Sequence, residues 1–212
     1  MHYLTECQQF YRQFRDQYHT PGSIMPSSRA LARALTRPMR HQKSPRRILE
    51  VGPGTGAVTA EIVRQLRPGD QFDIVEINGD FVALLQKRFA EEPDFRRVQT
   101  QSHIIHAPLQ EVPGEQEYDF LISGLPLNNF SPELVEDIYR TYERLLKPIG
   151  TLSCFEYVWV REMKMPFVRG SERERLTKLK HYLEDKFRRF QIDEEIVMLN
   201  VPPAIARHLR FG

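Results

Sequence analysis

The stretch Ile48-Leu49-Glu50-Val51-Gly52-Pro53-Gly54-Thr55-Gly56-Ala57 decides the fold that we predict for this chain of 212 residues. It reads as a short apolar strand that carries one acid and runs into a turn with glycine at every second position. Such a turn bends tightly and lets a ligand approach the backbone amides before the next helix. A second apolar stretch, Phe72-Asp73-Ile74-Val75-Glu76, ends in an acid about 20 residues further on, where doubly wound folds accept both hydroxyls of a ribose.

The spacing E-x-G-x-G-x-G differs from the dinucleotide fingerprint G-x-G-x-x-G, because no pyrophosphate has to sit on the helix end. It resembles the S-adenosylmethionine (SAM) site of the Rossmann-like methyltransferases. The resemblance implies SAM as cofactor, with Glu50 and the glycine turn at its methionine end and Glu76 on its ribose. A tight turn without a ligand and a plain surface carboxylate are the alternatives. The expected cofactor contacts are Glu50, Gly52, Gly54, Thr55, Gly56, Glu76, Ile77, Pro108, Leu109, Ser123 and Gly124.

The pattern of elements along the chain predicts one α/β domain. Strands are expected at about 47–51, 71–76, 103–106, 118–123 and 151–159, the last after a turn at 147–150. Helices are expected near 56–67, 79–91, 132–146 and 171–189, and the segments 195–199 and 204–209 suit an antiparallel hairpin. Regular alternation of strand and helix implies a parallel sheet covered on both faces. Together with the resemblance, this predicts a Rossmann-like class I methyltransferase with a mostly parallel seven-stranded sheet and a C-terminal antiparallel hairpin.

Size and composition suit a protein of the reducing cytosol. A chain of this length with 41% apolar residues can bury a substantial core without staples. Its two cysteines, Cys7 and Cys154, are single and far apart, so no disulfide framework is expected. No apolar run approaches a membrane span, and the first residues lack the features of a signal peptide.

Two basic segments flank an acidic core. Residues 1–47 hold nine Lys and Arg against two acids, residues 48–160 hold nine against 18, and residues 161–190 hold ten against five. A protein that docks on an anionic surface shows this pattern, although ordinary solvated helices would also produce it. We predict an amphipathic, basic helical cap over residues 1–45. A methyltransferase domain over 46–212, with a basic helical insertion at about 161–190, would follow.

The predicted cap contains two helical patterns. Residues 3–18 are amphipathic, and Pro26-Ser27-Ser28 offers the N-cap of a second helix. In that second helix Leu31 and Leu35 would face inward, while Arg29, Arg33 and Arg37 form a basic stripe.

The loops after the third and fourth strands concern the adenine and the substrate. Methyltransferases often place an acid after the third strand, but this chain reads His106-Ala107-Pro108-Leu109-Gln110, so adenine would rely on backbone near Leu109 together with Gln110. The loop after the fourth strand reads Ser123-Gly124-Leu125-Pro126-Leu127-Asn128-Asn129-Phe130. Enzymes that methylate the exocyclic amine of a base carry Asn or Asp, then Pro, then an aromatic residue that stacks on the flipped base. Gly124 and Leu127 stand in the places of the amide and the aromatic ring, so a smaller or more flexible amine is favoured.

The chain resembles the bacterial SAM-dependent phospholipid N-methyltransferases, which methylate phosphatidylethanolamine towards phosphatidylcholine. The resemblance rests on stretches that span nearly the whole chain: Phe10 to Phe14, Ser23 to Ala32, Glu50 to Gly56, Ser123 to Phe130 and Asn200 to Ala204. It implies a cytoplasmic enzyme bound peripherally to the inner leaflet, whose amphipathic N-terminal helix closes over SAM and touches lipid. The expected partners are an anionic membrane surface and the phospholipid substrate, with no nucleic acid and no metal.

Methyl transfer needs little covalent help, because the sulfonium is already activated; the protein aligns the amine, excludes water and accepts a proton. Candidates for positioning or proton transfer are Tyr11, Tyr18, His19, Asn128 and Asn129, each of which can also be structural. Candidate substrate or membrane contacts are Arg12, Arg15, Ser28, Arg29, Arg33, Leu127, Tyr157, Arg169 and Lys178. Arg29 and Arg33 would receive the lipid phosphate, or they form a plain solvent-facing stripe.

Two other functions remain open at this point. An rRNA adenine N6-methyltransferase would share the fold and the glycine motif, and its partner would also favour basic segments. Gly124 and Leu127 disfavour it, as does the lack of a separate C-terminal RNA-binding domain. A membrane-docking protein without turnover is a third possibility, which the intact glycine turn and its acids disfavour.

Overall fold

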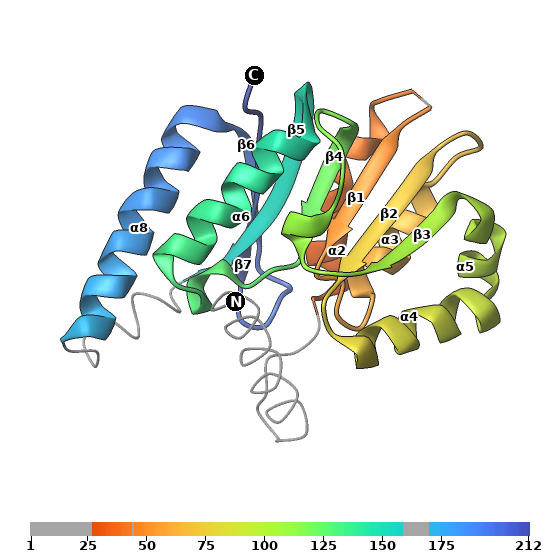
Figure 1. Cartoon of the computed structure of the whole chain (residues 1–212), viewed down its shortest axis with the longest axis horizontal. Helices are drawn as coiled ribbons and strands as arrows, with labels where there is room; N and C mark the ends of the chain where they lie inside the picture. The colour runs from red at the N-terminus through yellow and green to blue at the C-terminus, as the bar shows by residue number, and fades with distance from the viewer. Residues whose placement is uncertain (1–26, 44, 159–169) are drawn as a thin grey trace.

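The computed structural model describes residues 27–43, 45–158 and 170–212 (Figure 1). The helix predicted over 3–18 therefore lies outside the described residues. The described chain forms a seven-stranded sheet in the order β3-β2-β1-β4-β5-β7-β6, in which β7 runs in the direction opposite to the other six strands. The predicted Rossmann-like sheet with its C-terminal antiparallel hairpin is confirmed.

The elements have the following bounds. The strands are β1 (Arg47–Val51), β2 (Gln71–Glu76), β3 (Ser102–His106), β4 (Tyr118–Ser123), β5 (Leu146–Tyr157), β6 (Gln191–Val197) and β7 (Ala204–Leu209). The α-helices are α2 (Arg29–Thr36), α3 (Ala57–Gln65), α4 (Gly79–Glu91), α5 (Pro93–Arg97), α6 (Pro132–Leu145) and α8 (Ser171–Phe190). Short 3-10 turns are η1 (Arg37–Arg40), η2 (Gln99–Gln101), η3 (Leu109–Glu111) and η4 (Leu127–Asn129).

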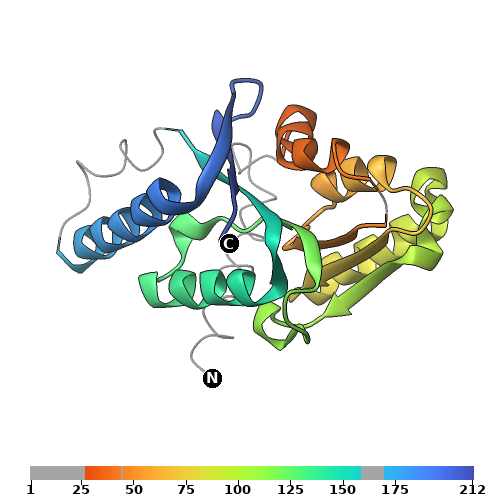
Figure 2. The same ribbon diagram turned by 90° about the horizontal axis from the view of Figure 1, so that it is seen from above.

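Helices cover both faces of the sheet (Figure 2). One core lies between the sheet and helices α2, α3, α4 and α5, and a second lies between the opposite face and helices α6 and α8. Strands β1 and β4 contribute to both cores, since alternate residues such as Ile48 and Leu49 point to opposite faces and both are fully buried. Helix α8 buries Leu179 and Leu183 in the second core, so residues 171–190 form a layer of the fold.

Two strand predictions need correction. Strand β5 begins at Leu146, because the expected turn at 147–150 is an irregular start of the strand, where Leu146 already pairs with Tyr118 before the register shifts. Strand β6 covers 191–197 instead of 195–199. Its exposed acids hid the strand pattern, and two of them, Asp193 and Glu194, are paired by Arg37 and Arg207 from neighbouring elements.

Helix α2 is joined to the β6–β7 hairpin at both ends. At its start, the Ser28 amide donates to Asn200 Oδ1 at 2.9 Å, and the Ser28 hydroxyl caps the helix by accepting from the Leu31 amide. After its end, Arg37 forms ion pairs with Asp193 at 2.6 Å and with Glu195 at 3.2 Å. The inward face of α2 is fully buried, as predicted for Leu31 and Leu35.

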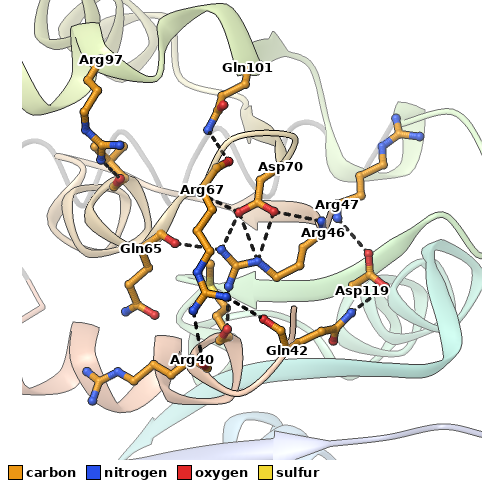
Figure 3. Close-up of polar contacts among 12 residues, drawn as sticks. Arg40, Gln42, Arg46, Arg47, Gln65, Arg67, Asp70, Arg97, Gln101 and Asp119 are labelled. Atoms are coloured by element: carbon orange, nitrogen blue, oxygen red, sulfur yellow. Dashed lines mark hydrogen bonds and ion pairs between the residues drawn. The ribbon is translucent and has the colours of Figure 1, made fainter. Parts of the chain in front are cut away.

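The amino edge of the parallel strands is fixed by a buried ion pair (Figure 3). The Arg46 guanidinium, which is inaccessible to solvent, binds the equally buried Asp70 carboxylate. It also donates to the carbonyls of Met39 at 2.6 Å and Gln65 at 2.8 Å. Asp70 in turn accepts from the amides of Arg46 and Arg67. This network joins η1, the end of α3 and the starts of β1 and β2. It involves only the amino edge of the sheet, so the loops at the carboxyl edge are not needed for it.

Candidate functional site

The glycine turn after β1 has the backbone that its sequence predicts. Gly52, Gly54 and Gly56 all have positive φ, at 65°, 55° and 82°, which only glycine adopts readily. A Cβ at Gly54 would meet nothing within 4 Å, so the turn opens there to space that a ligand can fill. A Cβ at Gly56 would lie 2.5 Å from Arg88 Nη1, which donates to the carbonyls of Thr55 and Gly56 at 2.8 Å and holds the turn from behind.

Glu50 is a buried carboxylate without a hydrogen-bond donor. Glu50 is 1% exposed, and neither of its carboxylate oxygens has a hydrogen-bond partner within the described structure. Burial raises the pKa of Glu50 to about 8; Thr59 nearby opposes that rise, although its hydroxyl makes no well-formed hydrogen bond. A cationic ligand group at this point would supply the missing donors and restore the charged form.

Glu76 connects the turn after β1 with the start of α4. Its carboxylate accepts from the Gly54 amide at 3.2 Å and from the Asn78 amide at 2.9 Å. Burial raises its pKa, and these backbone hydrogen bonds oppose the rise. Each carboxylate oxygen can accept more than one hydrogen bond, so Glu76 retains acceptor capacity for a pair of hydroxyls.

An apolar hollow lies beside Glu76 at the carboxyl ends of β1, β2 and β3. About 370 Å³ of empty space lies in and above it, open solvent included. It is lined by Val51, Gly52, Val75, Ile77, Ala107, Pro108, Leu109, Gln110, Leu125 and Ile138. Both polar atoms of the Gln110 amide are buried without a partner in the described structure. A flat, largely apolar group with a few polar atoms fits such a place, as the sequence predicts for adenine near Leu109 and Gln110.

Close packing of the loop after β4 against the glycine turn explains why position 124 is a glycine. The Gly124 amide donates to the Val51 carbonyl at 2.8 Å, and a Cβ on Gly124 would lie 2.4 Å from the Gly52 carbonyl oxygen. No side chain fits there while the glycine turn keeps its place. The Ser123 hydroxyl, expected near the cofactor, is buried in a 2.7 Å hydrogen bond with the Tyr142 hydroxyl.

The next residues of this loop divide into core and surface. Leu127 is 6% exposed and packs in the second core, so it is not placed to make the substrate or membrane contact that we expected. Asn128 is half-buried, and its Oδ1 atom is buried without a donor in the described residues. Asn129 is exposed. Of the two amides, only Asn128 offers an unsatisfied acceptor.

The remaining candidates are spread over several elements. Arg29 and Arg33 are exposed on α2, and Lys178 is exposed on α8. Tyr157 is half-buried at the carboxyl end of β5, edge-on to Phe155, and burial raises its pKa, so its hydroxyl stays protonated. Six candidates lie outside the described residues: Tyr11, Arg12, Arg15, Tyr18, His19 and Arg169.

Three contributors to the site escaped sequence analysis. Arg88 supports the glycine turn from 32 residues away, and no local pattern marks it. Asn78 caps α4 by accepting from the Asp80 amide and so fixes the backbone that binds Glu76. Ile138, on α6, closes the hollow; its helical periodicity shows only that it is buried.

Two further features were searched for in residues 27–43, 45–158 and 170–212. None of the helices in these ranges is both long and apolar enough to cross a bilayer. The same ranges hold no group of three or more His, Cys, Asp or Glu side chains placed to bind a metal ion.

Several known proteins are similar to this chain in sequence. Residues 48–150 match the family model described as "Methyltransferase domain". The ornithine lipid N-methyltransferase of Singulisphaera acidiphila is 34% identical over 140 residues, which cover 66% of this chain and 72% of that protein. The chain belongs to the Rossmann-like SAM-dependent methyltransferases. Ribosomal RNA small subunit methyltransferase A of Synechococcus sp. RCC307 is 38% identical over 101 residues, which cover 48% of this methyltransferase but only 35% of that relative.

Solved structures agree with the fold of this methyltransferase. An SAH-bound methyltransferase from Podospora anserina has a TM-score of 0.61 at 16% identity, over 98% of this chain and 88% of that one. The O-methyltransferase TomG from Streptomyces achromogenes, solved in complex with SAM, has a TM-score of 0.58 at 17% identity, over 99% and 90% of the two chains.

The methyltransferase has a site that fits its cofactor. In the part of the chain that the structure describes, the buried Glu50 carboxylate and the buried Gln110 amide have no hydrogen-bond partner, and the lining of the hollow is largely apolar. These three features suit the ammonium, the polar ring atoms and the flat ring of SAM. We expect Glu50 to hold the ammonium of SAM, Glu76 its ribose and the hollow its adenine. The open side of Gly54 would leave room for the chain that joins them.

Proposed function

We propose that this methyltransferase N-methylates the primary amine of a membrane aminolipid, such as phosphatidylethanolamine or an ornithine lipid, while bound peripherally to an anionic leaflet. The observation that carries the proposal is the loop after β4. At position 124, where base-methylating enzymes carry their amide acceptor, a Cβ would lie 2.4 Å from the Gly52 carbonyl oxygen. The similarity to an ornithine lipid N-methyltransferase over 72% of that relative supports an aminolipid as the alternative to a base.

Leu127 argues in the same direction. A flipped base needs an aromatic face to stack on, and a leucine that is 6% exposed within the core offers none. The similarity to rRNA methyltransferases covers only 35% and 36% of two of those relatives, so it does not extend to their remaining length. An amine on a flexible headgroup needs neither the missing amide nor the missing ring.

Asn128 is the residue that we assign to the amine. Its buried, unpartnered Oδ1 atom lies in η4, directly after the loop that packs on the glycine turn. A neutral amine that donates to this oxygen would be held in place, and its lone pair would stay free for attack. Leu125, Leu127 and Phe130 are buried around this segment and exclude water from it. When bound, SAM supplies the activated methyl group.

The proposal is tested by methyl transfer to defined acceptors. Purified protein with radiolabelled SAM is offered phosphatidylethanolamine vesicles, ornithine lipid vesicles or ribosomal RNA, and label is counted in each. We expect label in an aminolipid and none in RNA. Lipid mass spectrometry after expression in a host that lacks phosphatidylcholine identifies the product.

Asn128 and its exposed neighbour form a matched pair for the same assay. Asn128→Ala should lower kcat about 10²-fold, because the amine is no longer positioned, and should leave the affinity for SAH unchanged. Asn129→Ala should keep wild-type turnover. Labelling of ribosomal RNA without any labelling of lipid would reject the proposed function in favour of an rRNA adenine methyltransferase.

A further inference from the structure

The β6–β7 turn presents apolar side chains to solvent. Ile196, Met198, Leu199 and Val201 are 61%, 62%, 82% and 66% exposed. We call these four residues the tip patch. Among the described residues they make up most of the large apolar side chains that stand exposed, and they lie within six consecutive residues at the end of β6 and in the turn that follows. Such a gathering marks an interaction surface, because single exposed apolar residues are common but clusters are not.

The tip patch lies at the same edge of the sheet as the candidate site. Strands β5 and β6 both run antiparallel to β7, so β6 is parallel to β5 and ends at the carboxyl edge. Figure 1 shows the β6–β7 turn at the lower edge of the sheet, where the turns after β1 and β2 also lie. A surface that contacts the tip patch would therefore face the edge that holds Glu50, Glu76 and Asn128.

The turn that carries the tip patch is firmly anchored. Asn200, in its middle, is 2% exposed. Its Oδ1 atom accepts from the Ser28 amide at 2.9 Å, and its Nδ2 atom donates to the Pro202 carbonyl at 2.8 Å. Val197 and Ala204, on either side of the turn, are buried in the first core. The fold thus holds the apolar side chains outward, at the expense of leaving them in water.

The charges around the tip patch suit an anionic lipid surface. From Ile196 to Ala206 the sequence has no charged residue, so insertion would desolvate no charge. The acids earlier in β6 are paired by Arg37 and Arg207. Arg29 and Arg33 are exposed on α2, whose start is bound to the turn through Ser28, and neither has an ion pair among the described residues. Uncharged apolar side chains beside exposed arginines match the boundary between acyl chains and lipid phosphates.

We propose that the tip patch inserts into the headgroup boundary of the membrane, with Arg29 and Arg33 over the lipid phosphates, so that the candidate site faces the bilayer. The inference rests on the proposed function, because an aminolipid substrate requires this orientation. A fluid bilayer receives a convex, apolar turn without a matching groove, whereas a protein partner would need one.

An environment-sensitive dye tests insertion directly. Leu199→Cys is labelled with NBD in a Cys7→Ser background, where the other cysteine, Cys154, is buried. Ile149→Cys is the matched control, because Ile149 is 76% exposed but lies at the amino edge, at the start of β5. With vesicles of phosphatidylglycerol and phosphatidylcholine, we expect a blue shift and a severalfold rise in emission at position 199 alone. Vesicle-bound protein whose dye at position 199 stays in water overturns the proposal.

Binding of the unlabelled protein to vesicles gives a second measurement. Met198→Gln combined with Leu199→Gln should weaken sedimentation with vesicles about tenfold, since apolar insertion is lost. Ile149→Gln should not. Arg29→Glu combined with Arg33→Glu should weaken binding to anionic vesicles only, and less so at high salt, with Arg96→Glu on α5 as the control. Unchanged SAH affinity in each variant shows that the fold is intact.

The inference and the proposed function can fail separately. If the wild type labels aminolipid vesicles and the Met198/Leu199 variant binds and labels them equally well, the inference fails and the proposed function stands. If the wild type labels only RNA, the proposed function fails, and the dye experiment still reports whether the patch enters a bilayer. A dimer in solution that dissociates on replacement of Met198 and Leu199 would assign the patch to a second copy and overturn the inference.

Discussion

The amino edge and the carboxyl edge of the sheet both bury charged side chains, but in opposite surroundings. At the amino edge, Arg46 has an acceptor for each of its three nitrogens, and Asp70 also binds two backbone amides. At the carboxyl edge, Glu50 is as deeply buried, and neither of its carboxylate oxygens has a donor among residues 27–43, 45–158 and 170–212. The fold itself satisfies the charges that hold it together. It leaves unsatisfied the group that we expect to meet the cofactor.

The largest effect on stability should come from removing one partner of the buried ion pair at the amino edge. Asp70→Ala leaves the Arg46 guanidinium buried without its counterion and should lower the free energy of unfolding by about 3–5 kcal/mol. Urea denaturation of the ligand-free protein measures it. Glu115→Ala, which removes an exposed acid from a loop, should stay within about 0.5 kcal/mol of wild type. Equal losses in the two variants would mean that the buried pair has no special role.

At the carboxyl edge, removal of the buried charge of Glu50 should instead raise the free energy of unfolding. Because burial raises the pKa of Glu50 to about 8, the folded protein binds the proton more tightly than the unfolded chain does. Stability is therefore lost as the pH rises from the ordinary glutamate value towards 8. Glu50→Gln should remove that loss and stabilise the ligand-free protein at pH 8 by on the order of 2 kcal/mol, with little effect at pH 5.

The same variant should bind cofactor poorly. Loss of a charge-assisted hydrogen bond should weaken SAH binding at least about tenfold, as measured by calorimetry. Glu91→Gln, at an exposed position on α4, should change neither stability nor affinity. A Glu50→Gln protein that is less stable than wild type at pH 8, or that binds SAH normally, would refute the contrast between the two edges.

Substitutions at two glycines of the carboxyl edge should distinguish a residue that is needed for packing from one that is needed for access of the cofactor. Gly124→Ala forces a Cβ against the Gly52 carbonyl oxygen, so both stability, by about 1–3 kcal/mol, and SAH affinity should fall. Gly54→Ala has open space but a φ of 55°, so it should cost about 1 kcal/mol of stability and act mainly on SAH affinity. Thermal unfolding with and without SAH measures both. An equal loss of stability in the two variants would contradict the close contact at Gly124.

The smallest effect concerns protons. If the ammonium of SAH binds ionised Glu50, binding releases a proton wherever the free carboxyl is protonated. Affinity should then rise between pH 5.5 and 7.0, by at most about tenfold per unit, below the pKa of the ligand's own amine. Calorimetry in buffers of different ionisation enthalpy counts the proton. A flat profile in the wild type would show that Glu50 does not change its charge on binding.

Sequence analysis predicted the parts of the molecule that local patterns determine. Strands 47–51, 71–76 and 118–123 are confirmed because each is a short apolar run bounded by turn residues. The start of β5 was wrong because Lys147-Pro148-Ile149-Gly150 reads as a turn, while its pairing partner, Tyr118, is distant in sequence. At the site, the spacing of Glu50, the glycines and Glu76 places them at one edge of the sheet.

Contacts between distant segments could not be predicted in this way. Nothing near Ser28 indicates that its amide binds Asn200, which lies 172 residues away. Nor does the sequence show that Leu127 faces the core and Asn128 does not, because a single 3-10 turn decides it. These details depend on tertiary packing, and they explain why Leu127 was wrongly expected to contact substrate or membrane.

The position of β7 between β5 and β6 has a consequence for synthesis of the protein. Strands β5 and β6 are both synthesised before β7, which lies between them in the sheet. Strand β6 and helix α8 can therefore attach fully only after residues 204–209 have emerged. Until then β5 ends the nascent sheet with an open edge that carries Cys154 and Phe155, which are buried in the finished fold. An open apolar edge of this kind pairs readily with other chains. We therefore expect the nascent protein to be prone to aggregation in the interval before β7 is made.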